Sequence, residues 1–516
     1  MALTQRRPRN PDEFPTVQLF LLAIVRLAEP IALTSIFPYA WALIKKFKIG
    51  DESDASFYAG LLISSFSLAE ALMGMYWGSL SDRIGRKPVL LLGCVGTMFS
   101  MLMVGIAPNV WVALLGRAIG GLLNGNIAVI QTMVGELVTK PEHEPKAYSI
   151  MPFVWSVGTI IGPMLGGLFA DPHESWPETF PTGSLFERYP YLLPNIICAG
   201  LLLVSILLGY FLLEETHPDM QPRVLLPEDT FLSENTPLIE TSDAMKRPAV
   251  DLRDENYGTI RSRSGDKSDS AKSLEKRPEY NIFTDKRIMA VILSLSIFTY
   301  HSMTFDHLLP IFLEDDRATS HASIGVLRHL NPFYAPGGLG LSLQAVGMIM
   351  AVQGLIALFM QAVVFPVLAD RMGVYRLFIF VTVFHPITYI IMPGLLFVPE
   401  RLLYPAIYLF LGIRNFFGIL VYPLLLILVK EATPSLSILG KVNGLAASAG
   451  AACRMIAPPV AGYLYAVGRR MDCTALAWYG STLVAILGAI QCFQVTRDKS
   501  RQIRKEQTRD VEEADQ

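Results

Sequence analysis

Long apolar runs alternate with short polar segments along most of the chain. A helix needs about 20 apolar residues to cross the hydrocarbon core of a bilayer, and twelve runs approach or exceed that length. They lie at 16–41, 57–80, 88–107, 110–137, 147–170, 190–213, 286–313, 342–368, 376–398, 402–429, 442–467 and 474–494. The pattern predicts an all-α membrane protein with twelve transmembrane helices.

A polar segment separates the first six runs from the last six. Residues 214–285 are charged, rich in Ser, Pro, Asp and Glu, and poor in aromatic residues, a composition typical of a disordered linker. We therefore predict two six-helix bundles, 16–213 and 286–494, joined by a cytosolic loop. Short cytosolic tails, 1–15 and 495–516, complete the predicted organisation.

Basic residues near the ends of the runs predict the orientation of the chain. They precede the first run, join the second to the third and the fourth to the fifth, and recur in the central loop and the C-terminal tail. All of these segments lie on one side if the runs alternate, although Lys45, Lys46 and Lys48 lie on the other. We predict that both termini and the central loop face the cytosol. The first 15 residues lack an apolar region ending in a cleavage site, so no signal peptide is predicted.

The composition agrees with a membrane protein and excludes several other classes. Hydrophobic residues make up 52% of the 516 residues and charged residues 17%, against about 25% charged in typical soluble domains. The net charge of −2 gives no reason to expect a nucleic-acid partner. The five cysteines are scattered without a CxxC pair, so neither a disulfide framework nor a metal site is predicted. No cofactor is predicted either.

A short charged motif between the second and third runs has a second copy in the other half. Residues 78–91 read GSLSDRIGRKPVLL, and 365–378 between the eighth and ninth runs read FPVLADRMGVYRLF. The second copy is weaker, because Pro366 replaces the leading glycine and Val374 the first basic residue. Internal repetition of this kind is how many transporters are built.

Three motifs at matching positions resemble those of the major facilitator superfamily. The segment 78–91 resembles its signature loop, and LLGRAIGGLLNGNIA at 114–128 resembles its second motif. VGTIIGPMLGG at 157–167 resembles the G-x-x-x-G-P-x-x-G-G motif of proton-coupled antiporters. The first and seventh runs are similar to those of fungal drug:proton antiporters and plant zinc-induced facilitators. The resemblance covers nearly the whole chain and implies two bundles that rock around a midplane cavity.

The charged motif has the chemistry of a gate. A carboxylate such as Asp82 can bond the backbone N–H groups of a facing helix and pair with Arg86, in bonds stronger than neutral ones. Formed in one state and broken in the other, these bonds would hold the cytosolic side closed; the alternative is that the charges only set topology. The predicted gating residues are Gly78, Asp82, Arg83, Gly85, Arg86, Glu136, Asp370 and Arg371.

Several charged side chains lie inside the predicted spans, where they need partners or water. A charge at the bilayer centre costs roughly 2.5–3.5 kcal/mol on insertion scales. The resemblance implies that Arg117 serves proton coupling, although it also fits a purely structural tie. Arg26 and Glu29 share one helix face and can neutralise each other. The predicted proton or substrate path contains Arg26, Glu29, Glu70, Arg117, Asn124, His301, Asp306, Arg414 and Arg454.

The fifth run carries small residues that let helices approach closely, and a proline that bends the helix. The resemblance assigns them to antiport rather than uptake, and the alternative is packing without coupling. They are Gly158, Gly162, Pro163, Gly166 and Gly167.

The sequence thus predicts a secondary active transporter, with no enzymatic activity, that exports a small organic molecule in exchange for protons. A proton-coupled importer or a uniporter on the same fold is the alternative. A sugar carrier is less favoured, because FLLEETHPD stands where its P-E-S-P-R signature would be, and no pore loop suggests a channel. The H-x-x-x-x-D spacing of His301 and Asp306 leaves a membrane acyltransferase as a remote alternative.

The expected partners are a small-molecule substrate, protons and the lipid bilayer, and a monomer is the family expectation. The central loop contains SENTPLIE at 233–240, an acidic dileucine pattern that resembles sorting signals toward the vacuole or lysosome, and a serine-rich basic tract, RSRSGDKSDS. Phosphorylation of that tract would change its charge. We therefore expect either the plasma membrane or the vacuolar membrane.

Overall fold

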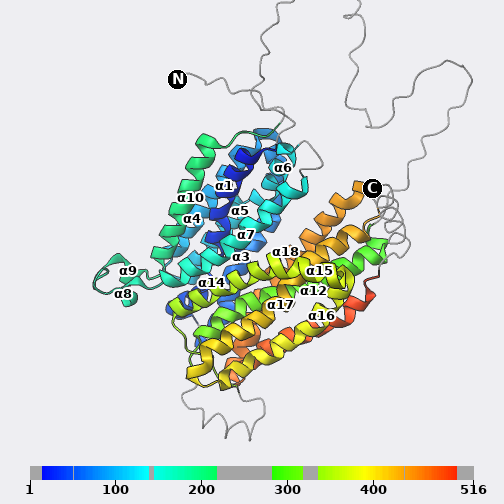
Figure 1. The fold of residues 1–516 in the computed structure, drawn as a ribbon. Helices are drawn as coiled ribbons and strands as arrows, with labels where there is room; N and C mark the ends of the chain where they lie inside the picture. Colours follow the sequence, from blue (N-terminus) through cyan, green and yellow to red (C-terminus); the bar gives the residue numbers. More distant parts are fainter. Residues whose placement is uncertain are drawn as a thin grey trace, which may run out of the picture. The chain divides into compact units, whose positions relative to one another are not determined.

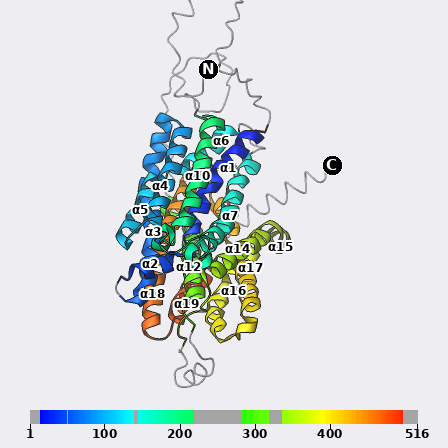
Figure 2. The same ribbon diagram turned by 90° about the vertical axis from the view of Figure 1, so that its left-hand side faces the viewer.

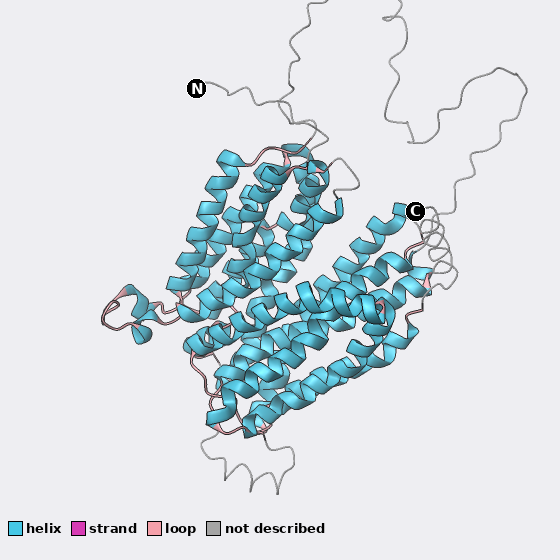
Figure 3. Cartoon of the chain, viewed as in Figure 1, coloured by secondary structure: helices cyan, strands magenta, loops and turns pink. Residues whose placement is uncertain are grey.

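The computed structural model describes residues 14–49, 51–138, 144–217, 282–317, 335–434 and 436–496. This part of the chain consists of helices joined by loops (Figure 3). The tails, most of the central loop with its dileucine and serine-rich tract, and Lys140 lie outside the described residues.

The helices of the first half lie together, and so do those of the second half (Figures 1 and 2). The first half contains α1 (Thr16–Ser35), α2 (Ala40–Phe47), α3 (Ala55–Ile84), α4 (Arg86–Gly105), α5 (Val110–Leu123), α6 (Asn126–Leu137), α7 (Glu144–Leu168), α8 (Pro172–Ser175), α9 (Leu185–Arg188) and α10 (Leu192–Leu212). The second contains α12 (Lys286–Glu314), α14 (Leu343–Phe359), the π-helix η5 (Met360–Val364), α15 (Phe365–Met372), α16 (Val374–Ile391), η6 (Met392–Phe397), α17 (Glu400–Ala432), α18 (Leu436–Arg470) and α19 (Ala475–Gln491).

These helices account for the twelve predicted spans. Within the described residues, nine helical segments are long and apolar enough to cross a membrane. The α5–α6 pair, α7 and α18 supply the other three. The helix α7 begins at Glu144, three residues before the predicted start of its span. The helix α18 carries Pro458 and Pro459 near its middle.

Two spans that the apolar pattern predicts as continuous helices are interrupted. The first span breaks between Ser35 and Ala40, and the fourth breaks at Asn124 and Gly125. Asn124 is extended, with φ −95° and ψ 106°. Its side-chain oxygen accepts a hydrogen bond from the backbone N–H of Asn126 at 3.0 Å. An asparagine that bonds the local backbone in this way competes with helical hydrogen bonding, and apolar periodicity does not reveal it.

The two copies of the charged motif adopt the same backbone turn. Gly85 alone links α3 to α4, with φ 100° and ψ 160°, and Gly373 alone links α15 to α16, with φ 78° and ψ 148°. Only glycine adopts this region without strain. The weaker second copy therefore keeps the residue that the turn requires, even though it lacks the first basic residue.

The two halves contact each other along two helix pairs, α3 with α18 and α7 with α14. The backbones approach so closely that a Cβ at Gly60 would collide with Pro458, and a Cβ at Gly167 would collide with Gly347. Ser56 Oγ donates to the carbonyl of Gly462 at 2.8 Å. We call this end of the bundle the contact side, and the end at which Gly85 joins α3 to α4 the motif side.

Candidate functional site

A buried carboxylate in the first half is held where span 4 is broken. Glu29 of α1 is 1% exposed and forms an ion pair with Arg26 one turn earlier. Asn124 Nδ2 donates to one oxygen of Glu29 at 2.7 Å, and Asn126 Nδ2 donates to the other at 2.9 Å. The guanidinium of Arg26 lies 5.6 Å from the ring of Trp155 on α7. The interruption of span 4 therefore turns two amides toward one carboxylate, and Asn126 joins the predicted set.

Arg117 of α5 is buried without a carboxylate partner. It is 3% exposed, and its Nε donates to the carbonyl of Leu62 at a long 3.4 Å. The guanidinium lies 4.7 Å over the ring of Phe66. It forms no ion pair with the described residues, and its Nη1 has no hydrogen-bond partner among them. Such an orphaned buried donor is unusual in a native protein and calls for a functional or structural explanation.

Glu70 and Arg454 lie on the two helices that join the halves, α3 and α18. Glu70 is half-buried and Arg454 is exposed. Glu70 interacts electrostatically with Arg454, and also with Arg117 and Glu29 within its own half. Glu70 thus lies near charges of its own half and near one charge of the second half.

The second half has its own buried arginine. Arg414 of α17 is 3% exposed and lies 4.0 Å over the ring of Phe305. One guanidinium nitrogen contacts Asp306 at 3.5 Å and Ser302 Oγ at 3.4 Å. The side chain of Asp306 is 39% exposed. The two halves therefore each place a buried guanidinium over a phenylalanine ring, but only the second pairs it with a nearby carboxylate.

Two histidines lie beside this arginine, and sequence reasoning found only one of them. His301 Nδ1 lies 2.8 Å from the hydroxyl of Tyr389, which itself donates to the carbonyl of His301 at 3.0 Å. The ring of His385 on α16 lies 4.7 Å from that of His301. The sequence pattern could have identified His385 as well, because it interrupts an apolar run in the same manner as His301.

The charged motif forms a compact cluster on the motif side. Arg86 donates to Asp82 at 2.5 Å, to Ser81 Oγ at 2.6 Å and to Glu136 at 3.0 Å. The side chain of Asp82 is 62% exposed. A Cβ at Gly78 would meet nothing within 4 Å. In this conformation the predicted gating residue Gly78 thus has open space beside it. Arg83, Asp370 and Arg371 are exposed.

The chain that leaves α10 completes this cluster, which sequence reasoning did not anticipate. Glu215 accepts hydrogen bonds from the backbone N–H groups of Arg86 at 2.9 Å and Lys87 at 3.1 Å. A carboxylate at a helix N-terminus is stabilised by the unpaired N–H groups there. Thr216 Oγ1 donates to Glu136 at 2.6 Å. The first residues of the predicted linker are therefore fixed to the motif.

The glycines of α7 provide close contact with α1. A Cβ at Gly158 would collide with Pro30, one at Gly162 with Thr34, and one at Gly166 with the backbone of Ser35. Pro163 lies in the same segment, and Gly167 makes the contact with α14 described above. The predicted antiporter motif therefore lies between α1, which carries Glu29, and the second half.

We expect Gly166→Ala to destabilise the protein by about 1–3 kcal/mol, the usual cost of overpacking, because the new Cβ meets the carbonyl of Ser35 rather than a movable side chain. Gly200→Ala on α10 is the matched control, since a Cβ there meets nothing within 4 Å. Thermal unfolding of the two purified variants checks the expectation. Equal melting temperatures would show that α7 and α1 separate without cost.

The contact side is held by polar bonds as well as by close packing. Arg470 of α18 donates to Asp54 at 2.5 Å, and His307 Nε2 lies 3.3 Å from the carbonyl of Ser56. At the same end, Asp315 accepts from Tyr465 at 2.9 Å and pairs with Arg469 at 3.4 Å. Burial raises the pKa of Asp315, although the guanidinium opposes this shift.

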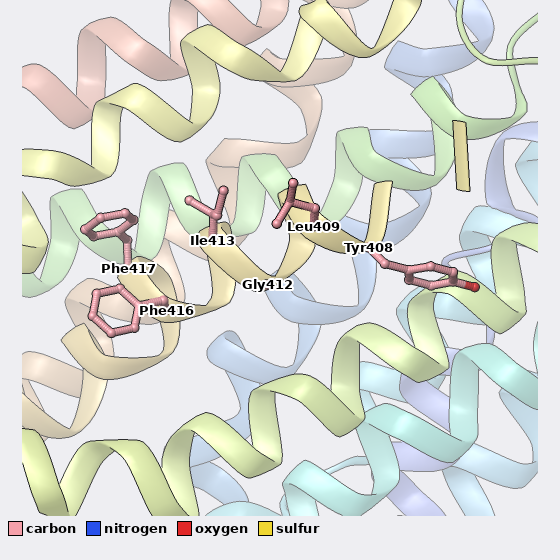
Figure 4. Close-up of a pocket in the computed structure, with 6 residues that line it drawn as sticks. All are labelled: Tyr408, Leu409, Gly412, Ile413, Phe416 and Phe417. Atoms are coloured by element: carbon pink, nitrogen blue, oxygen red, sulfur yellow. The ribbon is translucent and has the colours of Figure 1, made fainter. Parts of the chain in front are cut away.

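A separate apolar groove follows the outer surface of α17, with a volume of about 380 Å³. Figure 4 shows the residues that line it, with Phe416 and Phe417 at one end and Tyr408 at the other: Tyr408, Leu409, Gly412, Ile413, Phe416 and Phe417. None of them is charged, and none belongs to the predicted path.

Two repeated six-helix halves, each with buried charges inside its spans, define a multi-pass membrane transporter fold. Residues 22–328 match the Major Facilitator Superfamily, and the chain belongs to that family. The predicted family and fold are thereby confirmed.

Individual proteins show the same relationship. The chain is 36% identical to the Major facilitator superfamily multidrug transporter mfsB of Aspergillus fumigatus, over 95% of this chain and 85% of that protein. It is 26% identical to zinc induced facilitator 1 of Arabidopsis thaliana, over 89% and 85%. A bacterial homolog of the human lysosomal transporter Spinster, in an inward-facing and occupied conformation, superimposes with a TM-score of 0.62 at 12% identity, over 95% and 97%.

Proposed function

We propose that this transporter exports a small organic molecule from the cytosol in exchange for protons. The observation that carries the proposal is the buried Arg117, which forms no ion pair with the described residues yet interacts electrostatically with the half-buried Glu70. A carboxylate near a guanidinium binds a proton less tightly than one apart from it. Movement of Glu70 relative to Arg117 between two states therefore provides uptake and release of a proton.

The same geometry supports alternating access. The halves contact each other through Arg470 and Asp54 on the contact side, whereas Gly78 has open space on the motif side. We propose that this is the state open toward the motif side, which we place in the cytosol with both termini. The charged cluster around Arg86 would then engage the second half when that side closes. We expect a monomer in the plasma or vacuolar membrane.

Other activities have less support. A multidrug transporter among the relatives favours export over import. The acyltransferase alternative requires His301 and Asp306 to act on one substrate, but His301 contacts Tyr389 and Asp306 contacts Arg414. We therefore propose that the protein is not an enzyme.

Proton flux in proteoliposomes tests the proposal. The purified protein is reconstituted with a pH-sensitive dye inside, and organic cations, organic acids and metal chelates are added in turn. We expect at least one compound to drive proton movement, and an ionophore that collapses the pH gradient to stop its accumulation. Protein-free vesicles give the background. A compound that crosses the membrane without proton movement would identify a uniporter and overturn the exchange mechanism.

A further inference from the structure

An exposed arginine lies in the middle of the span that α18 forms. Arg454 is exposed and makes no ion pair with the described residues. The large apolar side chains that α18 exposes nearby, Ile456, Val460 and Tyr463, lie on the opposite side of the helix at 3.6 residues per turn. Charges inside a span face the interior of the bundle or a water-filled cavity rather than lipid. Arg454 therefore points away from the lipid-facing side of α18.

The helix face that carries this arginine meets the first half on the contact side. Ser56 Oγ donates to the carbonyl of Gly462, and a Cβ at Gly60 would collide with Pro458. Four residues forward along α3 thus correspond to four residues back along α18. One turn further toward the motif side, the same register brings Ser64 opposite the arginine.

This face of α18 is covered on the contact side and open on the motif side. Gly462 and Pro458 are buried, whereas Arg454, Ala447 and Asn443 on the same face are exposed. The arginine is therefore the first residue of the face that α3 no longer covers. A molecule that enters between the halves from the motif side reaches this position.

A carboxylate and an unsatisfied hydroxyl lie across from the arginine. Glu70 is half-buried and interacts electrostatically with Arg454, but the two form no ion pair. Ser64 is 5% exposed, and its Oγ has no hydrogen-bond partner among the described residues. Tyr300 of α12 is half-buried and lies near Cys453, which adjoins the arginine, so it adds an aromatic surface. Since buried polar atoms in native proteins nearly always have a partner, the hydroxyl indicates a further ligand.

We propose that Glu70 and Arg454 bind the two charged ends of a small zwitterion with an apolar side chain, a molecule built like an amino acid. Its ammonium group contacts Glu70, and its carboxylate contacts Arg454, whose guanidinium can hold both oxygens, and the hydroxyl of Ser64. That this molecule is the exported substrate rests on the proton exchange proposed above, whereas the binding itself does not. A proton and an ammonium group compete for one carboxylate, so such a site suits exchange.

Molecules with a single charge fit this pair less well. An organic anion is attracted to Arg454 but repelled by Glu70, and an organic cation meets the reverse. The other charges within the spans do not replace either residue. Arg26 pairs with Glu29 and Arg414 pairs with Asp306, while Arg117 is buried in the first half: these contacts and burials leave Arg454 as the exposed arginine of the described spans.

Calorimetric binding to the full-length protein in lipid nanodiscs tests the site with four probes that share one side chain. Phenylalanine carries both charges, N-acetylphenylalanine only the negative one, phenylalaninamide only the positive one, and N-acetylphenylalaninamide neither. We expect phenylalanine to bind at least about tenfold more tightly than each blocked probe, the usual effect of one charged hydrogen bond. Empty nanodiscs correct for partition into lipid.

Two variants connect each end of the ligand with its residue. In Arg454→Gln, phenylalanine and phenylalaninamide should bind equally, because the carboxylate has lost its partner. In Glu70→Gln, phenylalanine and N-acetylphenylalanine should bind equally, because the ammonium group has lost its partner. Arg401→Gln and Glu400→Gln are the matched controls, since both side chains are exposed at the start of α17. Both should bind the four probes like the wild type.

Equal binding of the four probes by the wild type, or no binding of phenylalanine, would overturn the inference. The same holds if Arg454→Gln still prefers phenylalanine to phenylalaninamide. If either variant does not fold, the wild type decides through phenylglyoxal, which modifies accessible arginines that mass spectrometry then locates. Phenylalanine should protect Arg454 but not Arg401, and N-acetylphenylalaninamide should protect neither. Equal modification of Arg454 with and without phenylalanine would overturn the site.

The two proposals fail separately. Selective binding of phenylalanine by a protein that moves substrate without proton flux would leave the site intact and refute the exchange mechanism. Proton flux that another compound drives equally in the wild type and in Arg454→Gln, with no discrimination among the four probes, would refute the site alone.

Discussion

Arg117→Ala is expected to abolish proton-linked transport while the protein remains folded. The substitution removes few polar contacts, since Arg117 makes one long hydrogen bond to Leu62, lies over Phe66 and has no ion pair among the described residues. Removing it also removes an intramembrane charge that costs roughly 2.5–3.5 kcal/mol. If Arg117 controls the proton of Glu70, the exchange rate should fall about 100-fold or more, as when a proton-transfer group is lost.

The measurement is substrate-driven proton flux in proteoliposomes, together with the melting temperature of each variant. Arg188→Ala is a control at an exposed arginine on α9, which lies 5.5 Å from the ring of Tyr189. Arg117→Lys keeps the positive charge but not the guanidinium geometry, so partial flux would separate the two contributions. Wild-type flux in Arg117→Ala would show that this arginine only ties the helices together.

The helices were predictable from the sequence because lipid imposes a single strong condition on the chain. A spanning segment must satisfy its backbone internally and present apolar side chains, so each span appears as a long apolar run. The repeat was visible for a similar reason: the one-residue turns at Gly85 and Gly373 both need a positive φ, which keeps glycine in each copy. Neither conclusion depends on contacts between distant segments.

The interrupted helices and the site contacts were not predictable in this way. The break at Asn124 depends on Glu29, which lies 95 residues earlier in the chain. The place of Glu215 in the charged motif depends on how α10 ends beside α4. The charges inside the predicted spans identify which residues need partners. Which partner each residue contacts depends on how the helices pack, and the apolar pattern does not reveal that packing. His385 was missed because it was treated as part of an apolar run, although the same reasoning had selected His301.

The halves also differ in chemistry although they repeat in fold. The first half surrounds a carboxylate with two amides and an arginine, whereas the second places two imidazoles beside an arginine–carboxylate pair. A repeat conserves helix packing, since both copies must fill the same shape, but it leaves the buried polar positions free to diverge.

Glu29→Gln should destabilise the protein strongly. The substitution removes the negative charge that neutralises Arg26, and both side chains are less than 10% exposed. Removing one partner of a buried ion pair costs about 3–5 kcal/mol, because the other charge is left uncompensated. The amides of Asn124 and Asn126 cannot replace the lost charge, since they are neutral. We therefore expect a clear fall in the melting temperature.

The cysteines provide the readout, because Cys94, Cys198 and Cys492 are buried and none of the five forms a disulfide. A dye that fluoresces on reaction with thiols will report their exposure as the protein unfolds. The double variant Arg26→Gln with Glu29→Gln removes both charges and should recover a large part of the lost stability. This recovery distinguishes an uncompensated charge from a simple packing defect, which the double variant would worsen. A single variant that melts like the wild type would mean that Glu29 already carries a proton in this state, which would make it, rather than Glu70, the carboxylate that exchanges protons.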